Sequence, residues 1–264
     1  MDLQLNGKRA LVTGSTAGIG YAIAEALAKE GAFVILNGRT QQRVDQALAQ
    51  LARSAANAKA AGVAADVGSA EGARKVTEAF PDVDILVNNA GIFEPKHFEE
   101  ITDAEWSRVF EVNVLSGVRL SRHYLPRMKR ANWGRIIFIS SESGLQIPPE
   151  MIHYGVTKTA QLALSRGLAE TTAGTSVTVN AVLPGPTASE GAVTFLDRMA
   201  ASRQADRKTI EQEFLRDARP TSLLGRFATP EEVAALVAFV CSPLSSATNG
   251  AALRVDGGVV RFIA

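Results

Sequence analysis

The stretch VTGSTAGIGYAIAEAL, residues 12–27, decides the fold of this chain. It continues the apolar run RALVT and places three glycines, Gly14, Gly18 and Gly20, ahead of an amphipathic helical pattern. Glycines let the backbone turn tightly and approach a pyrophosphate, while the unpaired N–H groups of the helix N-terminus face the phosphates. The stretch therefore predicts a strand–turn–helix unit that binds a dinucleotide, although glycines there can also serve the turn alone.

Short β-branched runs recur along the chain and alternate with longer amphipathic stretches. They read as buried strands at residues 9–13, 33–37, 85–88, 135–140 and 176–183, with a weaker candidate at 62–66. Apolar strands separated by helices are typical of a parallel sheet covered by helices on both faces. We therefore expect an α/β protein with a Rossmann-type, doubly wound parallel sheet in three layers, forming one domain over residues 1–264.

Several local patterns mark the ends of helices. Gly31 follows a helical pattern and suits a C-cap. Thr102 with Glu105, and Thr229 with Glu232, have the spacing of a capping box, and Pro230 suits the first position of a helix.

Residues 185–225 break the alternation of strands and helices. The segment is long and charged and contains no strand pattern. We expect a partly helical insertion that covers the substrate, and a solvated surface excursion is the alternative reading.

Composition argues against several classes of protein. Hydrophobic residues make up 46% of the 264 residues, charged residues 21%, and the net charge is +1, so no global field favours nucleic acid or an anionic membrane. There is no run of 18 apolar residues and no signal-peptide layout at the N-terminus, which leads us to expect a cytoplasmic protein without a membrane span.

Motifs for other chemistries are missing. The three histidines lack metal-type spacing, and the lone cysteine, Cys241, lies in an apolar run that indicates a small buried side chain. Neither a G-x-S-x-G elbow nor a Walker pattern occurs, which argues against a serine hydrolase and a P-loop nucleotidase.

The end of the second predicted strand bears on the choice of cofactor. It reads ILNGRT, with no carboxylate to hold a ribose 2′-hydroxyl, and it carries Arg39 instead. A guanidinium suits a 2′-phosphate through charge-assisted hydrogen bonds. The sequence therefore favours NADP(H) over NAD(H), with a solvated arginine as the alternative meaning of Arg39.

Tyr154 and Lys158 form the central catalytic candidate. Four residues apart on a helix, they share one face, and an ammonium beside a phenol lowers the pKa of that phenol. Such a tyrosine can exchange a proton with a carbonyl or alcohol oxygen. Ser141, at the end of a predicted strand, could bind the same oxygen, and Ser143 is its less favoured alternate. Asn113 lies on an apolar helix face, where its amide is either purely structural or carries a relay water for Lys158.

Taken together, the motifs resemble the short-chain dehydrogenase/reductase family. In order they are TGSTAGIG, ADV at Asp66, NNAG at 88–91, Asn113, SS with Ser141, YGVTK, NAVLPG and RVDGG. The resemblance implies a catalytic set of Asn113, Ser141, Tyr154 and Lys158, no metal, and an assembly that is commonly a homotetramer. It implies that the cofactor is bound by Gly14, Ser15, Thr16, Gly18, Ile19, Gly20, Arg39, Asp66, Val67, Asn89, Ala90, Gly91, Tyr154, Lys158, Pro184, Gly185 and Thr187.

The sequence thus predicts an NADP(H)-dependent oxidoreductase that interconverts a carbonyl and a secondary alcohol, with 3-oxoacyl thioesters or other ketones as candidate substrates. An NAD-dependent alcohol, sugar or steroid dehydrogenase is one alternative. A non-catalytic protein that senses NADP(H) is another. We expect the partner to be a small molecule, and the pocket to be built from residues 185–225 together with Glu142, Ser143, Gln146 and His153.

Overall fold

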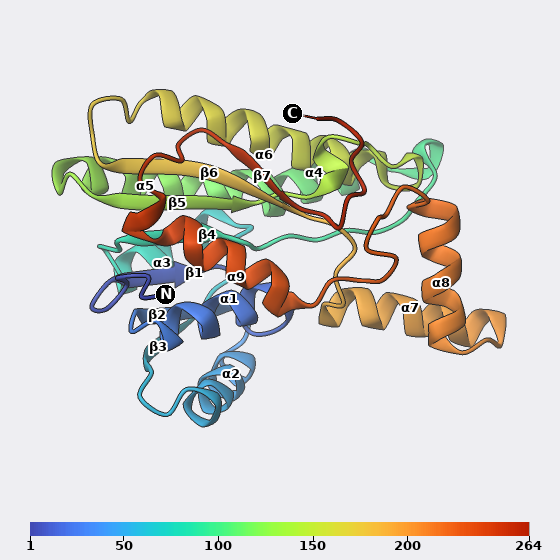
Figure 1. Cartoon of the computed structure of the whole chain (residues 1–264), viewed down its shortest axis with the longest axis horizontal. Helices are drawn as coiled ribbons and strands as arrows, with labels where there is room; N and C mark the ends of the chain where they lie inside the picture. Colours follow the sequence, from blue (N-terminus) through green and yellow to red (C-terminus); the bar gives the residue numbers. More distant parts are fainter. Residues whose placement is uncertain (264) are drawn as a thin grey trace.

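The computed structural model describes residues 1–263, and its centre is a seven-stranded parallel sheet (Figure 1). The strand order is β3-β2-β1-β4-β5-β6-β7, and every neighbouring pair is parallel. The strands are β1 (Arg9–Val12), β2 (Phe33–Gly38), β3 (Lys59–Ala64), β4 (Ile85–Asn88), β5 (Gly134–Ile139), β6 (Val177–Pro184) and β7 (Ala252–Val255). The predicted doubly wound α/β fold is confirmed.

Helices cover both faces of this sheet because side chains alternate between the faces along each strand. On β1, Val12 belongs to a core cluster with α1 and α9, whereas Leu11 belongs to one with α3 and α5. Figure 1 shows α1 and α9 on one side of the sheet and α5 and α6 on the other. These helices are α1 (Gly18–Lys29), α2 (Gln41–Ser54), α3 (Ala70–Ala79), α4 (Asp103–Phe110), α5 (Ser116–Arg130), α6 (Ile152–Glu170) and α9 (Pro230–Cys241).

The strand order reverses between β1 and β4. The chain moves outward from β1 to β3 and then returns to pair β4 with the free side of β1. Ligands of open α/β sheets bind beyond the carboxyl ends of the strands at such a switch point. The glycine turn after β1 and the NNAG segment that begins at the end of β4 both lie there.

Two strand predictions need correction. The third strand spans Lys59–Ala64 rather than 62–66, because the alanine-rich start of β3 pairs with β2 without a β-branched signal. The seventh strand, Ala252–Val255, was not predicted, since it is short and alternates between exposed and half-buried residues at the sheet edge.

The helix expected from Thr102 onward is interrupted. A π-helical segment, Glu111–Leu115, separates α4 from α5, and Asn113 lies within it. Such π-turns are frequent at functional sites.

Residues 185–225 contain two helices, α7 (Glu190–Arg203) and α8 (Arg207–Ala218), which lie beyond the carboxyl ends of the strands (Figure 1). They share a small core of their own with Phe227. The expectation of helices without a strand is confirmed apart from an isolated bridge between Thr187 and Ala228.

Helix α9 begins with the predicted capping box and ends at a buried cysteine, Cys241. Thr229 accepts the Glu232 N–H at 3.3 Å, and the Glu232 carboxylate accepts the Thr229 N–H at 2.8 Å. Cys241 is fully buried, and burial raises the pKa of its thiol to about 12.

Replacing Thr229 by alanine removes one side of this cap, so we expect Thr229→Ala to lower the free energy of unfolding by about 1 kcal/mol. Urea denaturation monitored by circular dichroism measures the loss. Thr229→Ser is the matched control, because it keeps the hydroxyl and is expected to retain most of the stability. Equal losses in both variants would assign the effect to the threonine methyl group.

Candidate active site

The turn after β1 needs glycine at each of its three positions, for two different reasons. Gly14 and Gly18 have φ angles of +61° and +56°, a region that other residues rarely adopt. A Cβ on Gly20 would lie 2.4 Å from the Asn89 amide nitrogen. The Asn89 amide in turn donates to the carbonyl oxygens of Thr13, at 2.9 Å, and Gly14, at 3.1 Å. The turn is therefore locked against the end of β4.

A groove of about 1030 Å³ runs along this turn. Its lining includes nearly all the predicted cofactor residues of the amino-terminal half, namely Gly14, Thr16, Gly18, Ile19, Gly20, Arg39, Asp66, Val67, Asn89, Ala90 and Gly91. The glycine cradle, in which an added Cβ would clash, fits the close approach of a dinucleotide pyrophosphate. Ser15 is absent from the lining, because its side chain turns inward to donate to the Val12 carbonyl and accept from the Asn37 N–H.

The end of β2 presents a cation to the groove. The Asn37 side chain is used internally, since its amide donates to the carbonyl oxygens of Val63 and Ala65 and its oxygen accepts the Gly14 N–H. Arg39 is exposed and lines the groove. Among the residues that the structure describes, β2 and the turn that follows it therefore contribute a cation and no carboxylate to the groove.

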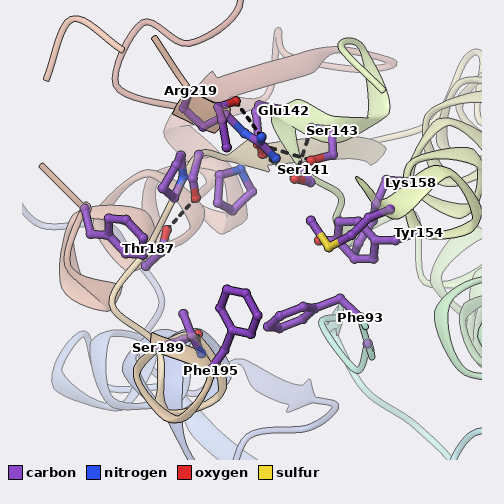
Figure 2. Close-up of a pocket in the computed structure, with 18 of the residues that line it drawn as sticks. Phe93, Ser141, Glu142, Ser143, Tyr154, Lys158, Thr187, Ser189, Phe195 and Arg219 are labelled. Carbon is purple, nitrogen blue, oxygen red and sulfur yellow. Dashed lines mark hydrogen bonds and ion pairs between the residues drawn. The ribbon is translucent and has the colours of Figure 1, made fainter. Parts of the chain in front are cut away.

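A second cavity, of about 520 Å³, adjoins the groove and shares Ile19, Asn89, Gly91, Phe93 and Ser189 with it. Three of the four predicted catalytic residues line it: Ser141, Tyr154 and Lys158 (Figure 2). Pro184, Gly185 and Thr187, which the family resemblance places among the cofactor-binding residues, also line it. Hence residues distant in sequence meet where the two cavities join.

Asn113 lies behind the second cavity rather than on its wall. Its amide donates to the Ile92 carbonyl and the Thr157 hydroxyl, each at 3.0 Å, and its side-chain oxygen accepts the Ile92 N–H at 2.8 Å. The side chain is therefore fully engaged in holding the segment after β4 against α6.

Sequence reasoning missed Gln161, a buried amide that links two of the predicted catalytic residues. Its Nε2 donates to the Asn113 main-chain carbonyl at 2.5 Å, and its Oε1 accepts from Lys158 Nζ at 3.2 Å. Lys158 also donates to the Ile139 carbonyl at 2.8 Å. Gln161 thus connects the Asn113 main chain directly to Lys158, where the sequence had left open whether the Asn113 amide is structural or carries a relay water. The YGVTKTAQ spacing places Gln161 on the Lys158 side of α6 and offered a signal that could have found it.

The two titrating groups are displaced from their usual ranges. Lys158 Nζ lies 5.4 Å from the centre of the Tyr154 ring, which confirms the shared helix face. Burial lowers the pKa of Lys158 to about 7, although Glu142 opposes this shift. Desolvation and then the Glu142 carboxylate raise the pKa of Tyr154. The pKa of the Tyr154 phenol is therefore raised, and not lowered as the spacing of Tyr154 and Lys158 predicted, because burial and Glu142 dominate.

Glu142 forms a buried ion pair with Arg219, which follows α8 (Figure 2). Arg219 Nε donates to Glu142 Oε1 at 2.9 Å, and Nη1 donates to Glu150 at 3.1 Å. The Ser141 hydroxyl donates to Glu142 Oε2 at 2.5 Å. Burial would lower the pKa of Arg219, but the two carboxylates outweigh it and raise that pKa. The segment after β5 that carries Ser141 is therefore joined to the helical insertion through the Glu142 carboxylate.

The rest of the second cavity is largely apolar. As predicted, Glu142 and Ser143 line it, together with residues of the 185–225 segment. Gln146 and His153, which were also predicted, do not line it. The His153 ring packs edge-on against Trp106, with ring centres 5.9 Å apart, and burial lowers the pKa of its imidazole. The hydrophobic walls, which the sequence did not reveal, are Phe93, Met151, Phe195, Met199, Phe214 and Phe227.

Comparisons with known proteins identify the family of this chain. The family model described as enoyl-(acyl carrier protein) reductase matches residues 14–260. An uncharacterized oxidoreductase, YvaG, of Bacillus subtilis (strain 168) is 51% identical over the full length of both chains. The 3-oxoacyl-(acyl-carrier-protein) reductase FabG of Aquifex aeolicus (strain VF5) is 35% identical, covering 98% of this chain and all of the relative. The chain belongs to the short-chain dehydrogenase/reductase family.

Among solved structures, L-sorbose reductase from Gluconobacter frateurii, complexed with NADPH and L-sorbose, superposes with a TM-score of 0.94. It is 33% identical, and the match covers 100% of both chains. As a short-chain dehydrogenase/reductase, the present protein is an enzyme that acts on CH–OH and C=O groups.

Among residues 1–263, no helix combines the length and apolar character that spanning a bilayer requires. Within the same range, no cluster of three or more histidine, cysteine, aspartate or glutamate side chains is arranged to hold a metal ion.

Because the Glu142 carboxylate raises the pKa of Tyr154, we expect Glu142→Gln to lower the pKa of that phenol. Ultraviolet absorbance of the phenolate measures it during a pH titration, with the Tyr154→Phe curve subtracted to isolate this tyrosine. Glu150→Gln is the matched control, since Glu150 also pairs with Arg219 but does not shift the pKa of Tyr154. An unchanged pKa in Glu142→Gln would show that Glu142 has no electrostatic influence on the phenol, and a higher pKa would show an influence of the opposite sign.

Proposed function

We propose that this enzyme is an NADP(H)-dependent oxidoreductase that interconverts a carbonyl and a secondary alcohol. The observation that carries the proposal is the convergence of Ser141, Tyr154 and Lys158 on a cavity that adjoins the groove along the glycine turn. A binding protein without chemistry would not need a phenol, a hydroxyl and an ammonium at this junction. The arrangement therefore favours catalysis over the sensing of a cofactor.

In this proposal each of the chain's groups has a distinct role. The nicotinamide cofactor, when bound, supplies the hydride that reaches the carbonyl carbon. Tyr154 donates the proton to the carbonyl oxygen, and the Ser141 hydroxyl orients that oxygen by a hydrogen bond. Lys158 would hold the nicotinamide ribose, with Pro184, Gly185 and Thr187 at the nicotinamide end. Asn113 supports Lys158 through Gln161, whose amide joins its main-chain carbonyl to the ammonium.

The electrostatics of the site set the resting protonation state of Tyr154. A raised pKa keeps the Tyr154 phenol protonated at neutral pH, so the proton to be donated is in place before the substrate binds. The reverse reaction needs a phenolate, which burial and Glu142 disfavour.

Arg39 supports the choice of NADP(H), because it places a cation at the end of β2, where a 2′-phosphate is expected. Two of the structural relatives, L-sorbose reductase and a gluconate 5-dehydrogenase from Beutenbergia cavernae that is described as putative, carry NADPH and NADP respectively. NAD(H) is the alternative.

The substrate is proposed to be a small ketone, with 3-oxoacyl thioesters among the candidates because of the similarity to FabG. Residues 185–225 would cover it, since α7 and α8 supply much of the cavity wall. A cytoplasmic homotetramer is the expected form of the enzyme.

Replacing the phenol tests the catalytic role directly. We expect Tyr154→Phe to bind NADPH as tightly as the wild type and to lose at least about 100-fold in kcat, because general acid catalysis contributes on that order. Calorimetry measures cofactor binding, and NADPH oxidation with a panel of ketones measures turnover. Tyr21→Phe is the matched control, since Tyr21 lies outside both cavities and contacts Ser54. Full activity in Tyr154→Phe would remove Tyr154 from the mechanism.

A further inference from the structure

An ion pair spans the groove proposed for the cofactor. Arg43, in the first turn of α2, lies with Nη2 2.6 Å from Oε2 of Glu190, the first residue of α7. Both side chains line the groove, and 147 residues separate them in the sequence. The contact therefore joins the sheet's own helix α2 to the helical insertion.

The start of α7 lies directly over the glycine turn. A Cβ added to Gly18 would lie 3.2 Å from the Ser189 Cβ, so Gly18 leaves the space that this approach needs. Ser189 lines both cavities, whereas Glu190 and Gly191 line only the groove. The Arg43–Glu190 pair thus crosses the groove from the first turn of α2 to the start of α7, next to the Ser189 that lines both cavities.

The end of β2 and the start of α2 form a positive corner. Arg39 and Arg43 flank the capping residue Thr40, whose side chain accepts the Arg43 N–H at 3.4 Å. The first turn of α2 holds no acidic residue, so its helix dipole and free N–H groups favour an anion. Arg39 makes no hydrogen bond or ion pair with any other described residue. Glu190 is the carboxylate that neutralises one of the two arginines.

We propose that Arg43 is a second binding residue for the 2′-phosphate of the cofactor, and that Glu190 competes with this phosphate for the Arg43 guanidinium. The proposal rests on the NADP(H) function argued above and adds to it the residue pair that sets cofactor preference. When the 2′-phosphate binds, Arg43 exchanges a carboxylate for a phosphate, and the link between α2 and α7 opens. NADH carries no such phosphate and leaves the link closed.

The exchange is favourable because the existing pair is weak. The side chains of Arg43 and Glu190 are 47% and 57% exposed, and ion pairs at exposed sites contribute little. A phosphate bound by two guanidinium groups gains charge-assisted and bidentate hydrogen bonds, which are about twice as strong as neutral ones. Glu190 therefore costs NADPH part of its affinity without blocking its site.

The test compares NADPH and NADH binding by calorimetry in single variants of the full chain. Arg43→Gln is expected to weaken NADPH binding by about tenfold, as the loss of one charge-assisted contact implies, and to leave NADH unchanged. Glu190→Gln is expected to tighten NADPH binding by about two- to fivefold, again with NADH unchanged, because only the competitor is removed. The two partners of one ion pair thus shift the affinity in opposite directions.

Matched controls are available on the same surfaces. Arg53→Gln removes another exposed arginine of α2, and Glu170→Gln removes a carboxylate from an exposed ion pair on α6, so both preserve the change in net charge without touching the groove. Neither control is expected to alter the affinity for either cofactor. A change in the controls equal to that in Arg43→Gln or Glu190→Gln would reduce the effect to overall charge and overturn the proposal.

Other outcomes separate this inference from the proposed function. If the wild type prefers NADPH, and Arg39→Gln abolishes the preference while Arg43→Gln keeps it, the function stands and the inference fails. Weaker NADPH binding in Glu190→Gln would mean that Glu190 positions Arg43 instead of competing for it, and equal shifts for both cofactors would mean a purely structural pair. Either result overturns the inference. Equal affinity of the wild type for the two cofactors overturns both.

Discussion

The close approach of Gly20 to the Asn89 amide is the constraint on which the rest of the structure depends. A side chain at Gly20 would occupy the position of the Asn89 nitrogen, and that nitrogen bonds the carbonyl oxygens of Thr13 and Gly14. This contact joins the turn after β1 to the end of β4 at the point where the strand order reverses. The groove follows the turn, and the second cavity opens where the NNAG segment leaves the sheet.

The sequence predicted those parts whose signals are local. Apolar β-branched runs located most strands, capping boxes located two helix starts, and the spacing of Tyr154 and Lys158 placed both on one helix face. Local signals did not identify strand residues that are ordered by pairing with neighbouring strands. The alanine-rich start of β3 and the short edge strand β7 are held by neighbouring strands rather than by their own propensity.

Contacts between distant segments could not be predicted in the same way. Glu142 and Arg219 are 77 residues apart, and the residues around each of them do not indicate that the two form an ion pair. The Gln161 amide, likewise, reaches a carbonyl in a π-helical segment that the sequence presented as a continuous helix. Both cases involve buried polar groups, which must find partners once the fold encloses them. The phenylalanines that line the second cavity likewise come from four separate segments, which only the complete fold brings together.

The burial of Cys241 has a practical consequence. This thiol is the chain's only one, it is completely enclosed at the end of α9, and its pKa of about 12 keeps it almost entirely in the unreactive protonated form at neutral pH. The folded wild-type protein is therefore expected not to react with thiol-directed labels. A single cysteine introduced on the outer surface of α7 would carry a fluorophore or spin label without background, so movement of the insertion can be followed in an otherwise unaltered enzyme.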